Sequence, residues 1–235
     1  MNLSEAKVLI TGGSSGIGYE TAKELIAKGA HVVICGRNES RLKQAGINLG
    51  CTTFTADVSK EEDVINLVKF SIETLGGLNV LINNAAYGYF DLLVDMNTEK
   101  FDEMISVNVK GAMMMGRECA KEFVKNNYGN IINISSTAGR AGFAAGTAYT
   151  ASKFALSAMT ECWRAELRKS NIRVMQVNPS EVQTNFIPNS GKPARAANPT
   201  KLEAEEIAHV IVSMLQMRDV GFITEATVFA TNPIN

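Results

Sequence analysis

Short apolar runs alternate with helical patterns along the whole chain, and this alternation restricts the fold more than any other feature of the sequence. The runs with the length and apolarity of buried strands are 7–11, 31–35, 52–56, 78–82, 130–134, 172–177 and 222–230. Between them, helical patterns cover 16–28, 40–49, 60–75, 99–126, 149–170 and 203–217. Near-continuous apolar strands joined by helices are typical of a parallel sheet covered on both faces. We therefore expect an α/β fold in which residues 1–235 form one domain around a doubly wound, parallel, seven-stranded sheet.

Composition supports one large core and excludes several classes of partner. Apolar residues make up 46% of the 235 residues and charged residues 20%, a balance that favours a folded core over disorder. The net charge is −1 and no basic run is present, so we expect no nucleic-acid partner. No apolar run reaches the roughly 18 residues of a membrane span, and the first residues lack an apolar signal core.

The cysteines are widely scattered, at Cys35, Cys51, Cys119 and Cys162. They form no C-x-x-C pair, which argues against a zinc site and against a redox pair. Reduced thiols are typical of cytosolic proteins, so we expect a cytoplasmic protein that binds no metal.

A glycine-rich turn follows the first predicted strand and opens the first helix. Gly12, Gly16 and Gly18 are spaced G-x-x-x-G-x-G, which differs from the G-x-G-x-x-G dinucleotide fingerprint but has the same strand–turn–helix context. Glycines let the backbone approach a pyrophosphate, and the helix N-terminus favours its charge. Ser14 and Ser15 add hydroxyl donors. The turn therefore predicts a dinucleotide site, and a tight turn without a ligand is the alternative.

The end of the second predicted strand indicates which dinucleotide is bound. Proteins that bind NAD usually carry an acidic residue here for the ribose 2′-hydroxyl, whereas this chain has Gly36 followed by Arg37. A guanidinium can form two hydrogen bonds to a 2′-phosphate, whereas a carboxylate would repel it. We therefore expect NADP(H) rather than NAD(H). The alternative is a solvated surface arginine.

Tyr149 and Lys153 stand four residues apart, which places them on one face of a predicted helix. A nearby ammonium favours the phenolate and lowers the pKa of a tyrosine from its usual value of about 10. Such a phenol can give a proton and take it back near working pH. An ordinary exposed helix carries such a pair by chance, so the other motifs decide its meaning.

Taken in order, the motifs resemble those of the short-chain dehydrogenase/reductase family over nearly the whole chain, which implies a Rossmann-type fold. The matching motifs are Thr11-Gly12-x-x-x-Gly16-Ile17-Gly18, Asp57-Val58, Asn83-Asn84-Ala85, Asn108, Ser136, Tyr149-x-x-x-Lys153 and Asn178-Pro179.

The resemblance implies a catalytic set. Tyr149 would be the general acid in reduction and the base in oxidation, while Lys153 would lower its pKa and hydrogen-bond the nicotinamide ribose. Ser136 would hold the substrate oxygen, and Ser135 is the less favoured of the two serines. Asn108, in a bent helix, would hold a water that links Lys153 to solvent. The alternative for Asn108 is a helix bend only.

The resemblance also implies a cofactor-binding set. Asp57 would contact the adenine amino group and Val58 its ring, and Asn83 and Ala85 would pass under the adenosine ribose. Pro179 and Thr184 would flank the nicotinamide. The complete implied set is Gly12, Ser14, Ser15, Gly16, Ile17, Gly18, Arg37, Asp57, Val58, Asn83, Ala85, Tyr149, Lys153, Pro179 and Thr184. Asn84 is expected to link strands instead.

The chain departs from the family pattern at three places. Ala86 and Ser180 stand where the family often has glycine, and residues 223–228 lack its glycine-rich strand ending. The family implies a homodimer or homotetramer, and this last departure puts the usual tetramer contacts in doubt.

These features predict an NADP(H)-dependent oxidoreductase that acts on a ketone, an aldehyde or a secondary alcohol. A 3-oxoacyl-thioester (acyl-carrier-protein) reductase is a narrower alternative. A non-catalytic NADP-binding regulator is a second, although all four predicted catalytic residues are present. An epimerase or dehydratase usually needs a G-x-x-G-x-x-G turn and a longer substrate domain, and the sequence has neither.

A mixed, mainly apolar substrate pocket is expected from Tyr87, Phe90, Thr137, Ala138, Arg140, Phe143, Ala144 and Phe186. Arg140 either meets an acidic substrate or caps the sheet edge. Residues 185–201 form either a mobile lid or a plain surface loop.

Overall fold

The computed structural model describes residues 1–191, 193 and 196–232. Its centre is a seven-stranded parallel sheet in the order β3-β2-β1-β4-β5-β6-β7. The strands are β1 (Lys7–Thr11), β2 (His31–Gly36), β3 (Thr52–Thr55), β4 (Val80–Asn83), β5 (Gly129–Ile134), β6 (Ile172–Pro179) and β7 (Glu225–Val228). The predicted Rossmann-type, doubly wound sheet is confirmed.

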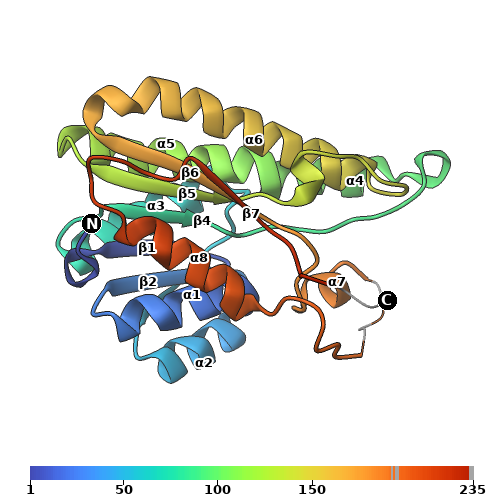
Figure 1. Cartoon of the computed structure of the whole chain (residues 1–235), viewed down its shortest axis with the longest axis horizontal. Helices are drawn as coiled ribbons and strands as arrows, with labels where there is room; N and C mark the ends of the chain where they lie inside the picture. The colour runs from blue at the N-terminus through green and yellow to red at the C-terminus, as the bar shows by residue number, and fades with distance from the viewer. Residues whose placement is uncertain (192, 194–195, 233–235) are drawn as a thin grey trace.

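Helices cover both faces of this sheet (Figure 1). One face carries α1 (Gly16–Ala27), α2 (Glu39–Leu49) and α8 (Ala204–Gln216). The other carries α3 (Glu61–Leu75), α5 (Ala112–Lys125) and α6 (Thr147–Leu167), with α4 (Thr98–Ile105) beside α6. A short helix, α7 (Phe186–Asn189), follows β6.

Both faces of the sheet are apolar. Successive side chains of a strand point to opposite faces, so each strand contributes to two hydrophobic cores. In β1, Val8 and Ile10 join the core under α1 and α8, while Leu9 joins the core under α3 and α5. All three side chains are fully buried. This double burial explains why the strands read as continuous apolar runs.

The strand order creates the place for a site. From β1 the chain proceeds to β2 and β3 on one side, and then returns to place β4 to β7 on the other. Connections therefore diverge at the carboxyl ends of β1 and β4, and ligands of open α/β sheets bind in such a crevice.

The predicted long helix over 99–126 is divided into α4, a π-helical turn that contains Asn108, and α5. Between α4 and α5, residues Ser106–Gly111 form a turn of π-helix (η3). A π-turn inserts one residue into the helical ladder and frequently occurs at functional sites.

The last strand is shorter than predicted. β7 consists of Glu225–Val228, which pair with Gln176–Pro179 of β6. Residues 222–224 and 229–230 therefore lie outside the sheet.

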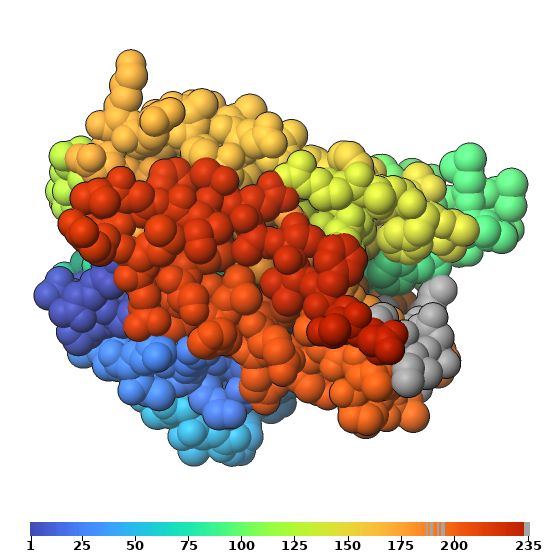
Figure 2. All heavy atoms as spheres, viewed as in Figure 1, coloured from blue at the N-terminus to red at the C-terminus, as the bar shows by residue number. Residues whose placement is uncertain are grey.

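The segment between β4 and α4 projects from the body of the molecule (green in Figure 2). It contains a short 3-10 helix, η2 (Leu93–Asp95). Its apolar side chains Leu92, Leu93 and Val94 are exposed. Among the described helices, none has the combined length and apolarity that crossing a membrane requires.

Candidate active site

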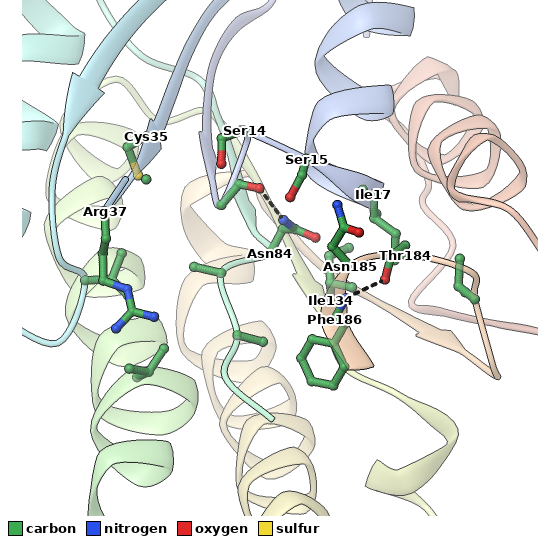
Figure 3. A pocket seen from close by; sticks show the side chains of 18 of the residues that line it. Ser14, Ser15, Ile17, Cys35, Arg37, Asn84, Ile134, Thr184, Asn185 and Phe186 are labelled. Carbon is green, nitrogen blue, oxygen red and sulfur yellow. Dashed lines mark hydrogen bonds between the residues drawn. The ribbon is translucent and has the colours of Figure 1, made fainter. Parts of the chain in front are cut away.

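A cleft of about 640 Å³ opens at the carboxyl ends of the central strands. The predicted site residues that line it are Gly12, Ser14, Ser15, Gly16, Ile17, Arg37, Asp57, Val58, Ala85, Ser136, Tyr149, Lys153, Pro179 and Thr184. The predicted residues Gly18, Asn83 and Asn108 lie outside this lining. Figure 3 shows Arg37 at one side of the cleft and Phe186 at the other, with Ser14 and Ser15 between them.

The glycine turn leaves the cleft open at positions where a side chain would intrude. Gly12 and Gly16 have φ values of +66° and +55°, in the left-handed region that favours glycine. A Cβ atom on Gly12 would lie 3.0 Å from the Cα of Ala85, and one on Gly16 would lie 3.2 Å from the Cγ2 of Thr184. The turn therefore needs glycine at both positions to keep this shape.

Gly18 acts through packing rather than by lining the cleft. A Cβ atom there would lie 2.6 Å from both the Nδ2 of Asn84 and the carbonyl oxygen of Gly12. Its hydrogen atom lets the first turn of α1 lie directly against the loop that follows β1.

Thr11 and Asn84 join the ends of β1 and β4. The Thr11 Oγ1 accepts hydrogen bonds from the backbone N–H groups of Asn84 (3.0 Å) and Ala85 (2.9 Å). The Asn84 Nδ2 donates in return to the carbonyl oxygens of Thr11 (3.0 Å) and Gly12 (3.1 Å). Asn84 thus links the strands, as expected, and it also lines the cleft.

The side chain of Asn83 lies away from the cleft, and the predicted place of this residue under the adenosine ribose stays a prediction. This side chain is buried, and its Nδ2 donates to the carbonyl oxygen of Ala112 (3.2 Å) and to the Oδ1 of Asn133 (3.0 Å). It points into the layer between the sheet and α5, whereas Asn84, the first residue after β4, lines the cleft.

Two residues at the Arg37 end were missed by sequence reasoning. Asn38 and Arg41 also line the cleft. The Asn38 Oδ1 accepts from the backbone N–H of Arg41 (2.9 Å) and so caps the N-terminus of α2. An asparagine before a helical run is a capping signal, and it could have placed Arg41 in the first turn beside Arg37.

Arg37 itself is held loosely. Its side chain is 55% exposed, and its Nη1 lies 3.9 Å from the Oε1 of Glu103, the outer limit for an ion pair. The guanidinium is therefore available to an anion in the cleft.

Asp57 shapes the wall next to Val58. The Asp57 Oδ1 accepts from the backbone N–H (3.0 Å) and the hydroxyl (2.8 Å) of Ser59, while its own N–H donates to the Oδ2 of Asp63 (2.9 Å). These bonds fix the turn that leads into α3 and present both residues to the cleft.

The two serines after β5 have different surroundings. Ser136 Oγ accepts from the backbone N–H of Ala138 (3.1 Å) and lies 3.5 Å from the carbonyl oxygen of Pro179, to which it donates. The Ser135 hydroxyl is buried and donates to the carbonyl oxygen of Lys153 at 3.3 Å. Of the two serines, Ser136 is therefore the one whose hydroxyl interacts with the Tyr149 side chain. Its predicted role of holding the substrate oxygen stays a prediction.

The expected acidification of Tyr149 is not found. Burial raises its pKa to about 12, with a smaller opposing effect of a hydrogen bond with the side chain of Ser136. Burial also lowers the pKa of Lys153 to about 8, and the Lys153 Nζ donates to the carbonyl oxygen of Ile134 (2.8 Å). Spacing along a helix brings the two side chains near each other, but desolvation is the main cause of both pKa shifts.

The Asn108 side chain forms three hydrogen bonds, all with other groups of the protein. Its Oδ1 accepts from the backbone N–H of Tyr87 (2.7 Å), and its Nδ2 donates to the carbonyl oxygen of Tyr87 (2.9 Å) and to Ser152 Oγ (3.0 Å). The side chain thus fastens the segment after β4 to the π-turn and to α6. Its predicted part in a water relay stays a prediction.

Arg140 caps the sheet edge. Its guanidinium binds the Glu225 carboxylate of β7 with two donors, with Nε 2.9 Å from Oε1 and Nη2 bonded to Oε2. Asn178, at the end of β6, donates to the same carboxylate. Of the two expectations for Arg140, the sheet-edge role is the one the structure supports.

The start of the segment 185–201 is helical rather than a loop. The backbone N–H of Phe186 donates to Thr184 Oγ1 (3.2 Å), and α7 follows (Figure 3). Residues 192, 194 and 195 lie outside the described part of the chain, and the expectation of a lid over 185–201 stays a prediction.

Comparison with known proteins agrees with this geometry. The family model described as short chain dehydrogenase matches residues 6–194. An uncharacterized oxidoreductase of Staphylococcus epidermidis is 30% identical over 228 residues, which cover 96% of this chain and 97% of that protein.

Two of the similar solved structures contain a nicotinamide cofactor or a derivative of one. An alcohol dehydrogenase from the archaeon Thermococcus sibiricus, complexed with 5-hydroxy-NADP, has a TM-score of 0.87 and 26% identity, covering 97% of this chain and 99% of that one. The 3-ketoacyl-(acyl-carrier-protein) reductase from Brucella melitensis, complexed with NADH, has a TM-score of 0.87 and 25% identity, covering 95% and 96%. This chain is therefore an oxidoreductase of the short chain dehydrogenase family, whose members use nicotinamide cofactors.

Proposed function

We propose that this protein is an NADP(H)-dependent oxidoreductase that interconverts a carbonyl compound and an alcohol, with Tyr149 as the general acid and base. The observation that carries the proposal is that one cleft joins Ser136, Tyr149 and Lys153 at one end to Arg37 and Arg41 at the other.

The cleft has the shape and chemistry that a nicotinamide dinucleotide requires. Gly12 and Gly16 leave space that a Cβ atom would fill, and the N-terminus of α1 follows directly. Backbone N–H groups at a helix N-terminus suit a pyrophosphate. Asp57 and Val58 would hold the adenine, while Pro179 and Thr184 would flank the nicotinamide. When bound, the cofactor supplies a hydride for reduction or accepts one in oxidation.

The two arginines favour the phosphorylated cofactor. Arg37 and Arg41 line the same end of the cleft, and a 2′-phosphate there would receive two guanidinium groups. Among the residues that line the cleft in the described part of the chain, Asp57 is the one carboxylate, and Ser59 already occupies its Oδ1.

In reduction, the hydroxyl groups of Ser136 and Tyr149 would donate hydrogen bonds to the substrate oxygen and stabilise the charge that grows there. The C=O double bond gains a hydride at carbon and the Tyr149 proton at oxygen, so that C–H and O–H bonds replace it. With a pKa of about 12, Tyr149 carries this proton throughout the neutral range. Lys153 holds its position through its hydrogen bond to Ile134 and would restore the proton afterwards.

The proposal is tested by following oxidation of NADPH and of NADH with a panel of ketones and aldehydes, using the full chain. We expect turnover with at least one uncharged carbonyl compound and a lower Michaelis constant for NADPH. A clear preference for NADH would contradict the role of Arg37 and Arg41. No turnover with any carbonyl or alcohol would contradict the enzymatic proposal.

A further inference from the structure

Three phenylalanines, Phe90, Phe143 and Phe186, form an aromatic wall beside Tyr149. The ring centroid of Tyr149 lies 5.3 Å from that of Phe90 and 5.6 Å from that of Phe186. Phe90 in turn lies 6.2 Å from Phe143 and 6.4 Å from Phe186. The three phenylalanines come from separate segments of the chain: Phe90 lies between β4 and α4, Phe143 lies between β5 and α6, and Phe186 begins α7. Of the three, Phe186 lines the cleft, and Phe90 and Phe186 both pack against the Tyr149 ring.

Two glycines make room for this aromatic wall. A Cβ atom on Gly88 would lie 2.8 Å from the Cζ of Phe186, and one on Gly146 would lie 2.7 Å from the Cζ of Phe143. Neither glycine has a φ in the left-handed region, so backbone conformation does not require glycine at these positions. Space for the two rings is the remaining reason for glycine here.

In the described part of the chain, few charged side chains lie at the end of the cleft that contains Tyr149. Within the described residues, the charged side chains that line the cleft are Arg37, Arg41, Asp57 and Lys153, and only Lys153 stands beside Tyr149. Lys153 is buried and hydrogen-bonded to Ile134, and Arg140 is held by Glu225. Among the described residues at this end of the cleft, a carboxylate would find no cation without a partner and would still lose its hydration.

We propose that the substrate is an uncharged carbonyl compound with a flat ring next to the carbonyl group, namely an aryl ketone or aryl aldehyde. This inference rests on the proposed function, and it assigns Phe90 and Phe186 as specificity-determining residues. Ring–ring contacts contribute beyond the area they bury, which corresponds to a preference of roughly three- to tenfold for an aryl over a saturated ring.

Three ketones test the inference with NADPH: acetophenone, cyclohexyl methyl ketone and 4-acetylbenzoate. They share a methyl ketone on a six-membered ring, and they differ in flatness and charge. Conjugation makes acetophenone the less reactive carbonyl toward hydride, so a preference for it must come from the protein. We expect kcat/KM for acetophenone to exceed that for cyclohexyl methyl ketone roughly three- to tenfold, mainly through KM. We also expect 4-acetylbenzoate to be the poorest substrate of the three.

Variants assign the preference to the aromatic wall. Phe186→Leu and Phe90→Leu keep apolar side chains without a ring, and each is expected to bring the ratio of the two uncharged ketones close to one. Gly88→Ala displaces the Phe186 ring without altering it and is expected to lower the same ratio. Gly142→Ala is the matched control, because a Cβ atom there meets nothing within 4 Å, and its ratio is expected to stay at the wild-type value.

The possible outcomes distinguish failure of the aryl assignment from failure of the proposed oxidoreductase function. Turnover of all three ketones with a ratio at or below one, or with 4-acetylbenzoate preferred, overturns the aryl assignment and leaves the oxidoreductase proposal in place. An unchanged ratio in Phe90→Leu, Phe186→Leu and Gly88→Ala overturns the role of the aromatic wall. Turnover of other carbonyl compounds but of none of these three also overturns the aryl assignment. Turnover of no carbonyl compound at all contradicts the proposed function itself.

Discussion

The ammonium nitrogen of Lys153 lies 5.7 Å from the centre of the Tyr149 ring. It donates instead to the carbonyl oxygen of Ile134, at the end of β5. The lysine is therefore anchored to the sheet near the tyrosine ring, and desolvation is the main cause of the pKa shift of both groups.

Stability should depend on pH through Lys153. Burial lowers its pKa in the folded protein to about 8, below the usual lysine value of 10.5. The unfolded chain therefore binds more protons between these values, so the free energy of unfolding rises with pH in this window. Relative to Lys153→Met, which cannot titrate, the wild type should gain on the order of 3 kcal/mol between pH 7.5 and 10.5. Urea unfolding of both proteins at a series of pH values measures this difference. A constant difference would show that Lys153 does not titrate in this range.

Replacement of Tyr149 by phenylalanine should abolish proton transfer while keeping the ring. We expect kcat to fall by roughly 10²- to 10⁴-fold, the usual contribution of a general acid, with NADPH affinity almost unchanged. Turnover and NADPH fluorescence titration measure the two effects. Tyr128→Phe is the control, since this phenol binds Asp219 away from the cleft. Activity close to the wild type in Tyr149→Phe would remove Tyr149 from the mechanism.

Replacement of Arg37 and Arg41 by alanine should change the choice of cofactor. The 2′-phosphate would lose charge-assisted hydrogen bonds, and partial exposure of Arg37 reduces their value. We expect each variant to raise KM for NADPH roughly five- to tenfold and to leave KM for NADH unaltered. Arg168→Ala, on an exposed turn after α6, serves as the control. A parallel rise of both Michaelis constants would point to a general loss of structure.

Replacement of Gly18 by alanine should disturb the packing of α1 against the glycine turn. The added Cβ atom would lie 2.6 Å from two atoms, one of them the backbone oxygen of Gly12, so α1 must shift. We expect a loss of about 1–3 kcal/mol in the free energy of unfolding, together with weaker binding of NADPH. Gly221→Ala, where nothing lies within 4 Å, controls for alanine substitution itself. Wild-type stability in Gly18→Ala would show that the turn tolerates a wider separation.

Local patterns in the sequence were sufficient to predict the fold. Apolar runs predicted the strands because both faces of the sheet are buried, and the spacing of Gly12, Gly16 and Gly18 located the turn after β1. These features depend on neighbours within a few residues, and such neighbours are visible in a sequence.

The surroundings of individual side chains were decided by the tertiary structure. The partner of Arg140 is Glu225, 85 residues away, and it is Asn84, the first residue after β4, rather than Asn83 that lines the cleft. Desolvation by the surrounding protein reversed the pKa shift expected for Tyr149. Desolvation and side-chain pairing depend on which distant segments meet in space, and spacing along the chain does not encode this directly.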